Sequence, residues 1–164
     1  MSWIRRKAAD GIRVGDQFQI TRTFTENDVL QFAAITRDYN PIHFDDRFVA
    51  AKGIERRICH GLLVGGMVTE IGGQIGWLAS GIDFRFKKPV YIGDTITCTL
   101  TIHTVGEHDR AQADAVFTNA RGEVVLTAHI RGRLPNDTDR NVLRQMMAEG
   151  DPTNPLSEKG SGGI

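Results

Sequence analysis

Cysteine is scarce in this sequence. Only Cys59 and Cys98 occur among 164 residues, and their separation matches neither a zinc-binding pair nor a redox-active pair. His103, His108 and His129 also lack the spacing of metal ligands, so we expect no metal site. The N-terminus, Met1-Ser2-Trp3, does not resemble a secretory signal that would suggest export to an oxidising compartment. A cytoplasmic protein is therefore expected.

An excess of either charge is also absent. Lysine and arginine together number 20, as do aspartate and glutamate, so the formal net charge at pH 7 is zero. Binding to nucleic acid or to an anionic membrane surface usually needs an excess of positive charge. We therefore expect neither partner.

No long hydrophobic run is free of polar side chains. Residues 61–80 are mostly apolar and have about the length of a membrane span. However, Thr69, Glu70 and Gln74 lie in the middle of this segment, where an ionisable side chain would be costly in lipid. The segment therefore predicts a buried helix, not a membrane helix.

The pattern of polar and apolar residues predicts one α+β domain over residues 1–133. A helix should begin after Thr25, a typical N-cap, and end near Asp38 because Pro41 disfavours helical geometry just before it. A short helix or turn follows at 45–51, and a long helix begins near Gly61. Strands are expected at 17–23, 82–86, 95–103, 110–119 and 123–133. Because short turns join the later strands, we expect an antiparallel sheet wrapped around the long central helix.

The long helix is rich in glycine. Each interior glycine costs about 1 kcal/mol relative to alanine, so the repeated occurrence needs a reason. We expect close packing of another backbone segment against this helix. The glycines concerned are Gly65, Gly66, Gly72, Gly73 and Gly76.

The C-terminal part, residues 134–164, has a different composition. Residues 139–149 can form a short amphipathic helix through apolar side chains such as Leu143 and Met146. From Gly150 onward the chain is rich in proline, glycine, serine and charge, which predicts disorder.

The segment from Asp38 to His43 carries the most specific chemical signal. A carboxylate and an imidazole lie five residues apart, in a loop that Pro41 forces out of the helix. Such a pair can bind one water and perform acid–base chemistry near neutral pH. The alternative is a helix-ending turn, since Asp and the Asn40–Pro41 pair also stabilise turns.

A second signal is the start of the long helix at His60–Gly61. The first N–H groups of a helix have no intrahelical partners and can stabilise developing negative charge. Gly61 has no side chain to keep a ligand away from its N–H. The alternative is an ordinary helix start with a small residue.

Three motifs together resemble the MaoC-type dehydratases and (R)-specific enoyl-CoA hydratases. The first is Asp38-x-Asn40-Pro41-Ile42-His43, the second is His60-Gly61-Leu62, and the third is Phe86-Lys87-Lys88-Pro89-Val90-Tyr91-Ile92-Gly93-Asp94. They fall in the family's order, and the resemblance runs from about residue 14 to residue 133.

The resemblance implies a hot-dog fold and a reaction. The enzyme would interconvert trans-2-enoyl and (3R)-3-hydroxyacyl thioesters, usually as a homodimer. Asp38 and His43 would activate water, and the Gly61 N–H would polarise the thioester carbonyl. Asn40, His60 and Arg37 are added as candidate substrate-binding residues. The expected partner is an acyl-CoA or an acyl-carrier-protein thioester, with coenzyme A entering as part of the substrate and no separate cofactor.

The sequence departs from the family pattern at Arg37. The family usually has glycine before the motif aspartate, and arginine cannot adopt every backbone conformation of glycine. Arg37 could contact a substrate carboxylate or a CoA phosphate, or it could be a solvated residue at a helix end.

Two other functions use the same fold or ligand. A hot-dog thioesterase acts on the same thioesters, although the Asp-x-Asn-Pro-x-His spacing argues against it. A non-catalytic acyl-thioester binding domain would not need both Asp38 and His43. A nucleophilic role for Cys59 is weaker still, because no base can be assigned to it.

Overall fold

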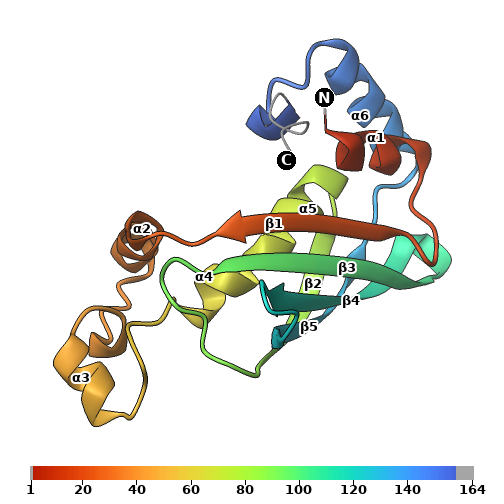
Figure 1. Ribbon diagram of the computed structural model, residues 1–164. Helices are drawn as coiled ribbons and strands as arrows, with labels where there is room; N and C mark the ends of the chain where they lie inside the picture. Colours follow the sequence, from red (N-terminus) through yellow and green to blue (C-terminus); the bar gives the residue numbers. More distant parts are fainter. Residues whose placement is uncertain (1, 158–164) are drawn as a thin grey trace.

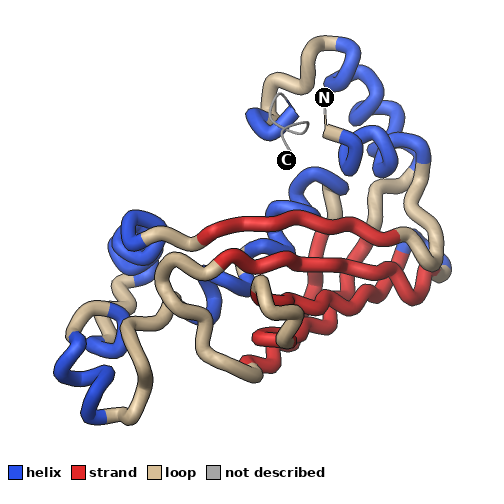
Figure 2. Tube along the Cα trace, in the orientation of Figure 1, coloured by secondary structure: helices blue, strands red, loops and turns tan. Residues whose placement is uncertain are grey.

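The computed structural model describes residues 2–157, and Figures 1 and 2 show the arrangement of its elements. The helices are α1 (Trp3–Asp10), α2 (Glu26–Thr36), α3 (Asp46–Ala51), α4 (Gly61–Gly65), α5 (Met67–Ile75) and α6 (Asp137–Ala148). The strands are β1 (Gln17–Thr23), β2 (Leu78–Phe86), β3 (Thr95–Val105), β4 (Arg110–Asn119) and β5 (Val124–Arg133). Short 3₁₀ helices are η1 (Pro41–His43), η2 (Glu107–Asp109) and η3 (Pro155–Ser157).

The strands form one antiparallel sheet in the order β1-β3-β4-β5-β2. The sheet curves around α5, as Figure 2 shows. Alternate residues of β3 and β4 point inward, and their apolar side chains pack against the buried face of α5. Fully buried members of this core include Phe18, Ile71, Ile75, Leu100 and Phe117. The predicted α+β architecture is confirmed.

The central helix is shorter than predicted and has two parts. α4 and α5 meet at Gly66, and α5 ends at Ile75 because Gly76 takes the left-handed conformation (φ 80°). The N–H of Trp77 then bonds the carbonyl of Gly72, which closes the helix end. β2 starts at Leu78, so the prediction of helix up to residue 80 and of a strand beginning at 82 was wrong. Apolar residues continue through this junction, and hydrophobicity alone could not locate the change.

Two of the helix glycines are needed for close packing, although their partners are aromatic side chains and not backbone. A Cβ at Gly61 would lie 2.5 Å from Cε1 of Phe86, and a Cβ at Gly65 would lie 2.9 Å from Cε1 of Phe84. Both phenylalanines come from β2, and their rings stack with centroids 6.2 Å apart. The same explanation fails for residues 72–73, where an added Cβ would meet nothing within 4 Å.

The N-terminal helix α1 was not predicted. It lies beside α6, and both lie near the end of α5 that is distant from α2 and α3 (Figure 1). Arg144 of α6 donates a hydrogen bond of 2.8 Å to the carbonyl of Ala9. The short C-terminal helix was predicted at 139–149 and is present as α6.

Residues 150–157 are folded, which corrects the prediction of disorder from Gly150. Asp151 is 2% exposed and Asn154 is 5% exposed. The Asn154 amide donates to the Asp151 carboxylate at 3.0 Å, and Nε of Arg5 in α1 lies 3.8 Å from the same carboxylate. Composition could not reveal this, because the buried ion pair joins the segment to a helix at the other end of the chain. The remaining part of the predicted disorder, residues 158–164, lies outside the described residues.

Substitutions at Arg5 and Asp151 test whether this buried ion pair stabilises the C-terminal segment. Asp151→Ala should lower the free energy of unfolding by roughly 3 kcal/mol, because Arg5 would keep a buried charge without its partner. Replacing both residues, as Arg5→Met with Asp151→Leu, should restore most of the stability. Urea denaturation measures both. An Asp151→Ala variant as stable as the parent protein would show that the C-terminal segment does not depend on this pair.

Within residues 2–157, no helix is long and apolar enough to cross a bilayer.

Candidate active site

A cavity of about 620 Å³ lies where α2, α4 and the end of β2 meet. The Asp38 and His43 side chains line it together with His60 and Gly61. Most of its remaining wall is apolar and includes Phe32, Val64, Phe86, Val90, Val125 and Leu126. The three sequence motifs therefore come together at one cavity.

Asp38 is positioned by the end of α2. The helix begins with a capping box between Thr25 and Asp28 and ends at Thr36. Arg37 then takes the left-handed conformation, with φ 60° and ψ 25°, and its N–H bonds the Ala33 carbonyl at 2.7 Å. Glycine takes this conformation without strain, whereas arginine and other residues with a Cβ pay an energetic cost in that region.

His43 is buried at the end of η1, with 6% of its surface exposed. Its Nδ1 lies 2.8 Å from the Ile58 carbonyl oxygen. A carbonyl only accepts hydrogen bonds, so Nδ1 carries the proton and Nε2 is left as an acceptor. Burial lowers the pKa of His43 below its usual 6.5, and nearby His60 also lowers it, while the bond to Ile58 and the Asp38 carboxylate oppose the shift. At neutral pH His43 therefore offers a free lone pair.

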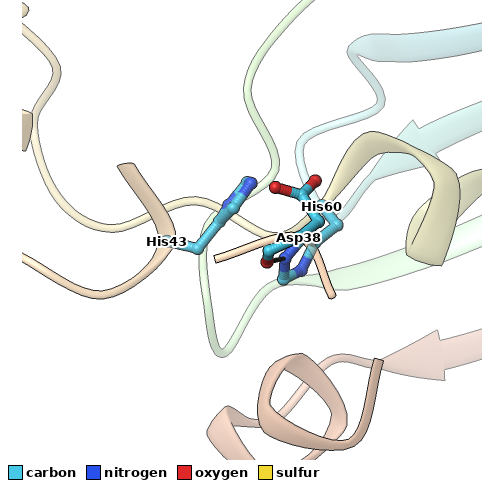
Figure 3. A group of neighbouring side chains, drawn as sticks. All are labelled: Asp38, His43 and His60. Atoms are coloured by element: carbon cyan, nitrogen blue, oxygen red, sulfur yellow. Dashed lines mark hydrogen bonds between the residues drawn. The ribbon is translucent and has the colours of Figure 1, made fainter. Parts of the chain in front are cut away.

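His60 is even more deeply buried, with 2% of its surface exposed. Its Nε2 donates to the backbone carbonyl of Asp38 at 2.9 Å. Its ring stacks on the His43 ring, with centroids 3.7 Å apart and an angle of 30° between the planes. Figure 3 shows the Asp38 carboxylate beside the outer end of the His43 ring, and the His60 ring against the Asp38 backbone.

Asp38, His43 and His60 each offer a possible metal-ligand atom within 4.8 Å of the others. The stacked rings, however, hold their lone pairs in planes only 30° apart, whereas ligands of one metal ion must converge on it. The arrangement suits a hydrogen-bonded water better than a metal ion.

Gly61 begins α4, as the sequence predicted. His60 before it is extended (φ −59°, ψ 132°) and provides no side-chain cap, so the first N–H groups of the helix have no side-chain acceptor from it. Gly61 lines the cavity, and no acceptor for its N–H is found within residues 2–157. The Phe86 ring, which also lines the cavity, occupies the position that a side chain at Gly61 would need.

Two other predicted residues do not line the cavity. Asn40 uses its side-chain oxygen to accept the Ile42 N–H at 3.2 Å, so it stabilises the turn that carries His43. Arg37 is exposed at the end of α2. Substrate binding by Asn40 and Arg37 remains a prediction.

Among the other cavity residues, Phe32 and Thr36 were not singled out as site residues from the sequence, whereas Lys87 and Lys88 were considered as contacts for CoA phosphates or as solvated strand residues. Phe32 and Thr36 come from α2, and Lys87 and Lys88 follow β2. Nζ of Lys88 lies 2.7 Å from the Glu123 carboxylate. The helical spacing of four between Phe32 and Thr36 was the only available signal for these two residues, because it places both on one face of α2.

Cys59 also lines the cavity but is unsuited to nucleophilic chemistry. Burial, followed by the charges of Asp94 and Asp28, raises the pKa of its thiol to about 12. The reactive thiolate is therefore scarce at neutral pH.

Comparison with known proteins identifies the family. Residues 12–123 match the MaoC like domain. The chain belongs to the MaoC-like domain family. An (R)-specific enoyl-CoA hydratase of Aeromonas caviae is 32% identical over 135 residues, which cover 78% of this chain and 99% of the relative. A mitochondrial 3-hydroxyacyl-[acyl-carrier-protein] dehydratase of Arabidopsis thaliana is 37% identical over 87 residues, 52% of each chain.

Solved structures of MaoC-like hydratases share the fold. The R-hydratase PhaJ1 of Pseudomonas aeruginosa superimposes with a TM-score of 0.72 at 26% identity, covering 78% of this chain and 85% of that chain. The MaoC-like chain therefore has the hot-dog fold, with the sheet wrapped around α4 and α5. α1 and α6 lie outside the residues that match the MaoC like domain.

Proposed function

We propose that this protein is a hydratase that interconverts trans-2-enoyl and (3R)-3-hydroxyacyl thioesters, with CoA as the main thiol carrier. The observation that carries the proposal is the cluster at the cavity. The free Nε2 of His43 and the Asp38 carboxylate lie next to each other, and both line the cavity with Gly61. The (R)-specific hydratase of Aeromonas caviae, which matches most of this chain, supports the same assignment.

The reaction can be written with these groups. The thioester carbonyl accepts a hydrogen bond from the Gly61 N–H, and a water bridges Asp38 and His43. His43 is neutral and has a lone pair on Nε2, so it takes a proton from the water as the oxygen bonds to the β-carbon. Electron density moves from the carbon–carbon double bond onto the thioester oxygen, and the Gly61 N–H stabilises this enolate. A proton returned from the acid–base pair to the α-carbon completes the addition of one water.

The apolar cavity wall fits an acyl chain. Its volume of about 620 Å³ lies in the range of small-molecule sites. Lys87 places positive charge at the same cavity, which suits the phosphates of CoA or of an acyl-carrier-protein prosthetic group, whereas the charge of Lys88 is paired with Glu123. No separate cofactor takes part in this scheme.

We also infer that the protein is a homodimer, as expected from the family. β2 is an edge strand whose outer backbone groups are unpaired within residues 2–157. Leu78 and Phe86 at its two ends are 73% and 57% exposed. A second copy pairing with this strand would cover both side chains.

One experiment distinguishes the proposed hydratase from the alternative function, a thioesterase. With a trans-2-enoyl-CoA as substrate, a hydratase removes the enoyl absorbance and releases no free thiol. A thioesterase releases CoA thiol, which a thiol-reactive dye detects. We expect absorbance loss with no thiol signal. Thiol release that keeps pace with substrate consumption would assign the cavity to hydrolysis.

A further inference from the structure

His60 is a buried polar residue that contacts Asp38 and His43 but takes part in no step of the proposed reaction. It directly precedes Gly61, so the residue at the thioester carbonyl and the residue against the acid–base pair are neighbours in sequence. Its Nε2–H bonds the Asp38 carbonyl at 2.9 Å, across 22 positions of sequence. One face of its ring lies against His43 with centroids 3.7 Å apart.

Neither nitrogen of the His60 ring is well placed to bind a substrate directly. Nε2 is occupied by the Asp38 carbonyl, and Nδ1 is buried with no hydrogen-bond partner within residues 2–157. The Phe32 ring lies 5.0 Å from it, inclined at 48°, and His43 covers a face. Phe32, His60 and His43 therefore form a packed aromatic column at the cavity wall.

The column fixes the directions of both acid–base groups. The bond from His60 to the Asp38 carbonyl holds the loop just after the left-handed turn at Arg37. Stacking on one face of His43, together with the bond from Nδ1 to Ile58, leaves the ring only small freedom to rotate. Nε2 is then held in one direction, which general base catalysis requires.

We propose that His60 is a positioning residue. It holds the Asp38 backbone and the His43 ring in fixed positions relative to the Gly61 N–H. The proposal rests on the hydratase function given above. It replaces the substrate-binding role that the sequence suggested for His60. Asp38 and His60 are the titratable groups that act on His43, from the loop after α2 and from the residue before α4.

Two substitutions separate the two contacts of His60. His60→Phe keeps a ring for stacking and loses the N–H donor, whereas His60→Gln keeps an N–H donor and loses the ring. Each should lower kcat by roughly 10- to 100-fold with little change in KM, because misplacement of reacting groups by about 1 Å costs that much.

The pH profile distinguishes positioning from a general structural role. Removing the ring in His60→Gln hydrates His43 and removes a neighbour that lowers its pKa, so the acid limb of kcat/KM should move to higher pH. His60→Phe also removes that neighbour but keeps the ring that shields His43 from water, so its acid limb should move less, because burial is the largest cause of the shift. A raised KM at unchanged kcat would instead assign His60 to substrate binding, and a lower kcat in His60→Gln with an unmoved acid limb would assign it a structural role. Both results would overturn the proposal.

A measurement on the unaltered protein covers the case in which the variants do not fold. Imidazole nitrogen NMR should show the proton of His60 on Nε2 and that of His43 on Nδ1 at neutral pH. The opposite tautomer of His60 would overturn the proposal, since the bond to the Asp38 carbonyl would then be impossible. Absence of hydratase activity in the unaltered protein would refute the proposed function instead, and the NMR result would be unaffected by it.

Discussion

Asp38→Asn and His43→Asn are each expected to lower kcat by roughly 10²-fold to 10⁴-fold, the usual contribution of general acid–base catalysis. Asparagine keeps polarity at either position but cannot exchange a proton at neutral pH. His43→Asn also loses the bond from Nδ1 to the Ile58 carbonyl, which costs about 1 kcal/mol of stability. Hydration of a trans-2-enoyl-CoA should therefore be measured at saturating substrate, well below the melting temperature.

A matched control exists on the exposed outer face of the sheet. His129 and Asp114 form the same kind of pair, with Nδ1 and Oδ1 2.7 Å apart, but neither lines the cavity. His129→Asn and Asp114→Asn should leave kcat unchanged. If Asp38→Asn or His43→Asn keeps near-parental turnover, the acid–base roles proposed here are wrong.

The pH dependence of the parent enzyme follows from the pKa of His43. Because burial lowers that pKa, the neutral base persists below pH 6.5, and kcat/KM should fall only on further acidification. In Asp38→Asn the carboxylate that raises the His43 pKa is lost, so the acid limb of the residual activity should move to still lower pH. An acid limb above pH 6.5 in the parent enzyme would contradict a buried His43 base.

Removal of the Gly61 N–H is expected to lower kcat by roughly 10²- to 10³-fold, as for other oxyanion donors. Proline is suited to this position. It is tolerated at the first residue of a helix, and the extended conformation of His60 is the one favoured before proline. The obstacle is Phe86, whose Cε1 would lie 2.5 Å from any Cβ placed at Gly61.

The comparison is therefore made in a Phe86→Leu background, because leucine lacks the Cε1 and Cζ atoms that crowd Gly61. Phe86 is 57% exposed, so this change should cost little stability. Gly61→Ala in that background keeps the N–H, and Gly61→Pro removes it. The proline variant should be folded and much slower in kcat than the alanine variant. Equal kcat values at saturating substrate would show that another group holds the thioester carbonyl.

Alternation of side chains was enough to predict most of the sheet. The predicted bounds of β1 and β4 agree with the structure, and those of β3 and β5 differ only at one end. Alternation works here because each of these strands buries one face against the core. It gave the wrong start for β2, an edge strand that follows a helix without a polar break. α1 escaped prediction because its eight residues bury only Ile4, Ala8 and Ala9 as an apolar face.

The site shows the same division between local and long-range information. Asp38 and His43 could be identified because both lie on one loop shaped by Pro41. The contact of Phe86 with Gly61, and the stacking of His60 on His43, join segments distant in sequence. No local pattern encodes such contacts, so the role of His60 could only be inferred once the fold was known.

The configuration of the hydration product tests the central claim most directly. Purified protein is incubated with a trans-2-enoyl-CoA in water, and the 3-hydroxyacyl product is resolved on a chiral phase. The proposed function predicts consumption of the enoyl thioester and a product that is almost entirely the 3R alcohol, as the similarity to an (R)-specific enoyl-CoA hydratase suggests. A 3S product, or release of free CoA without hydration, would contradict the assignment.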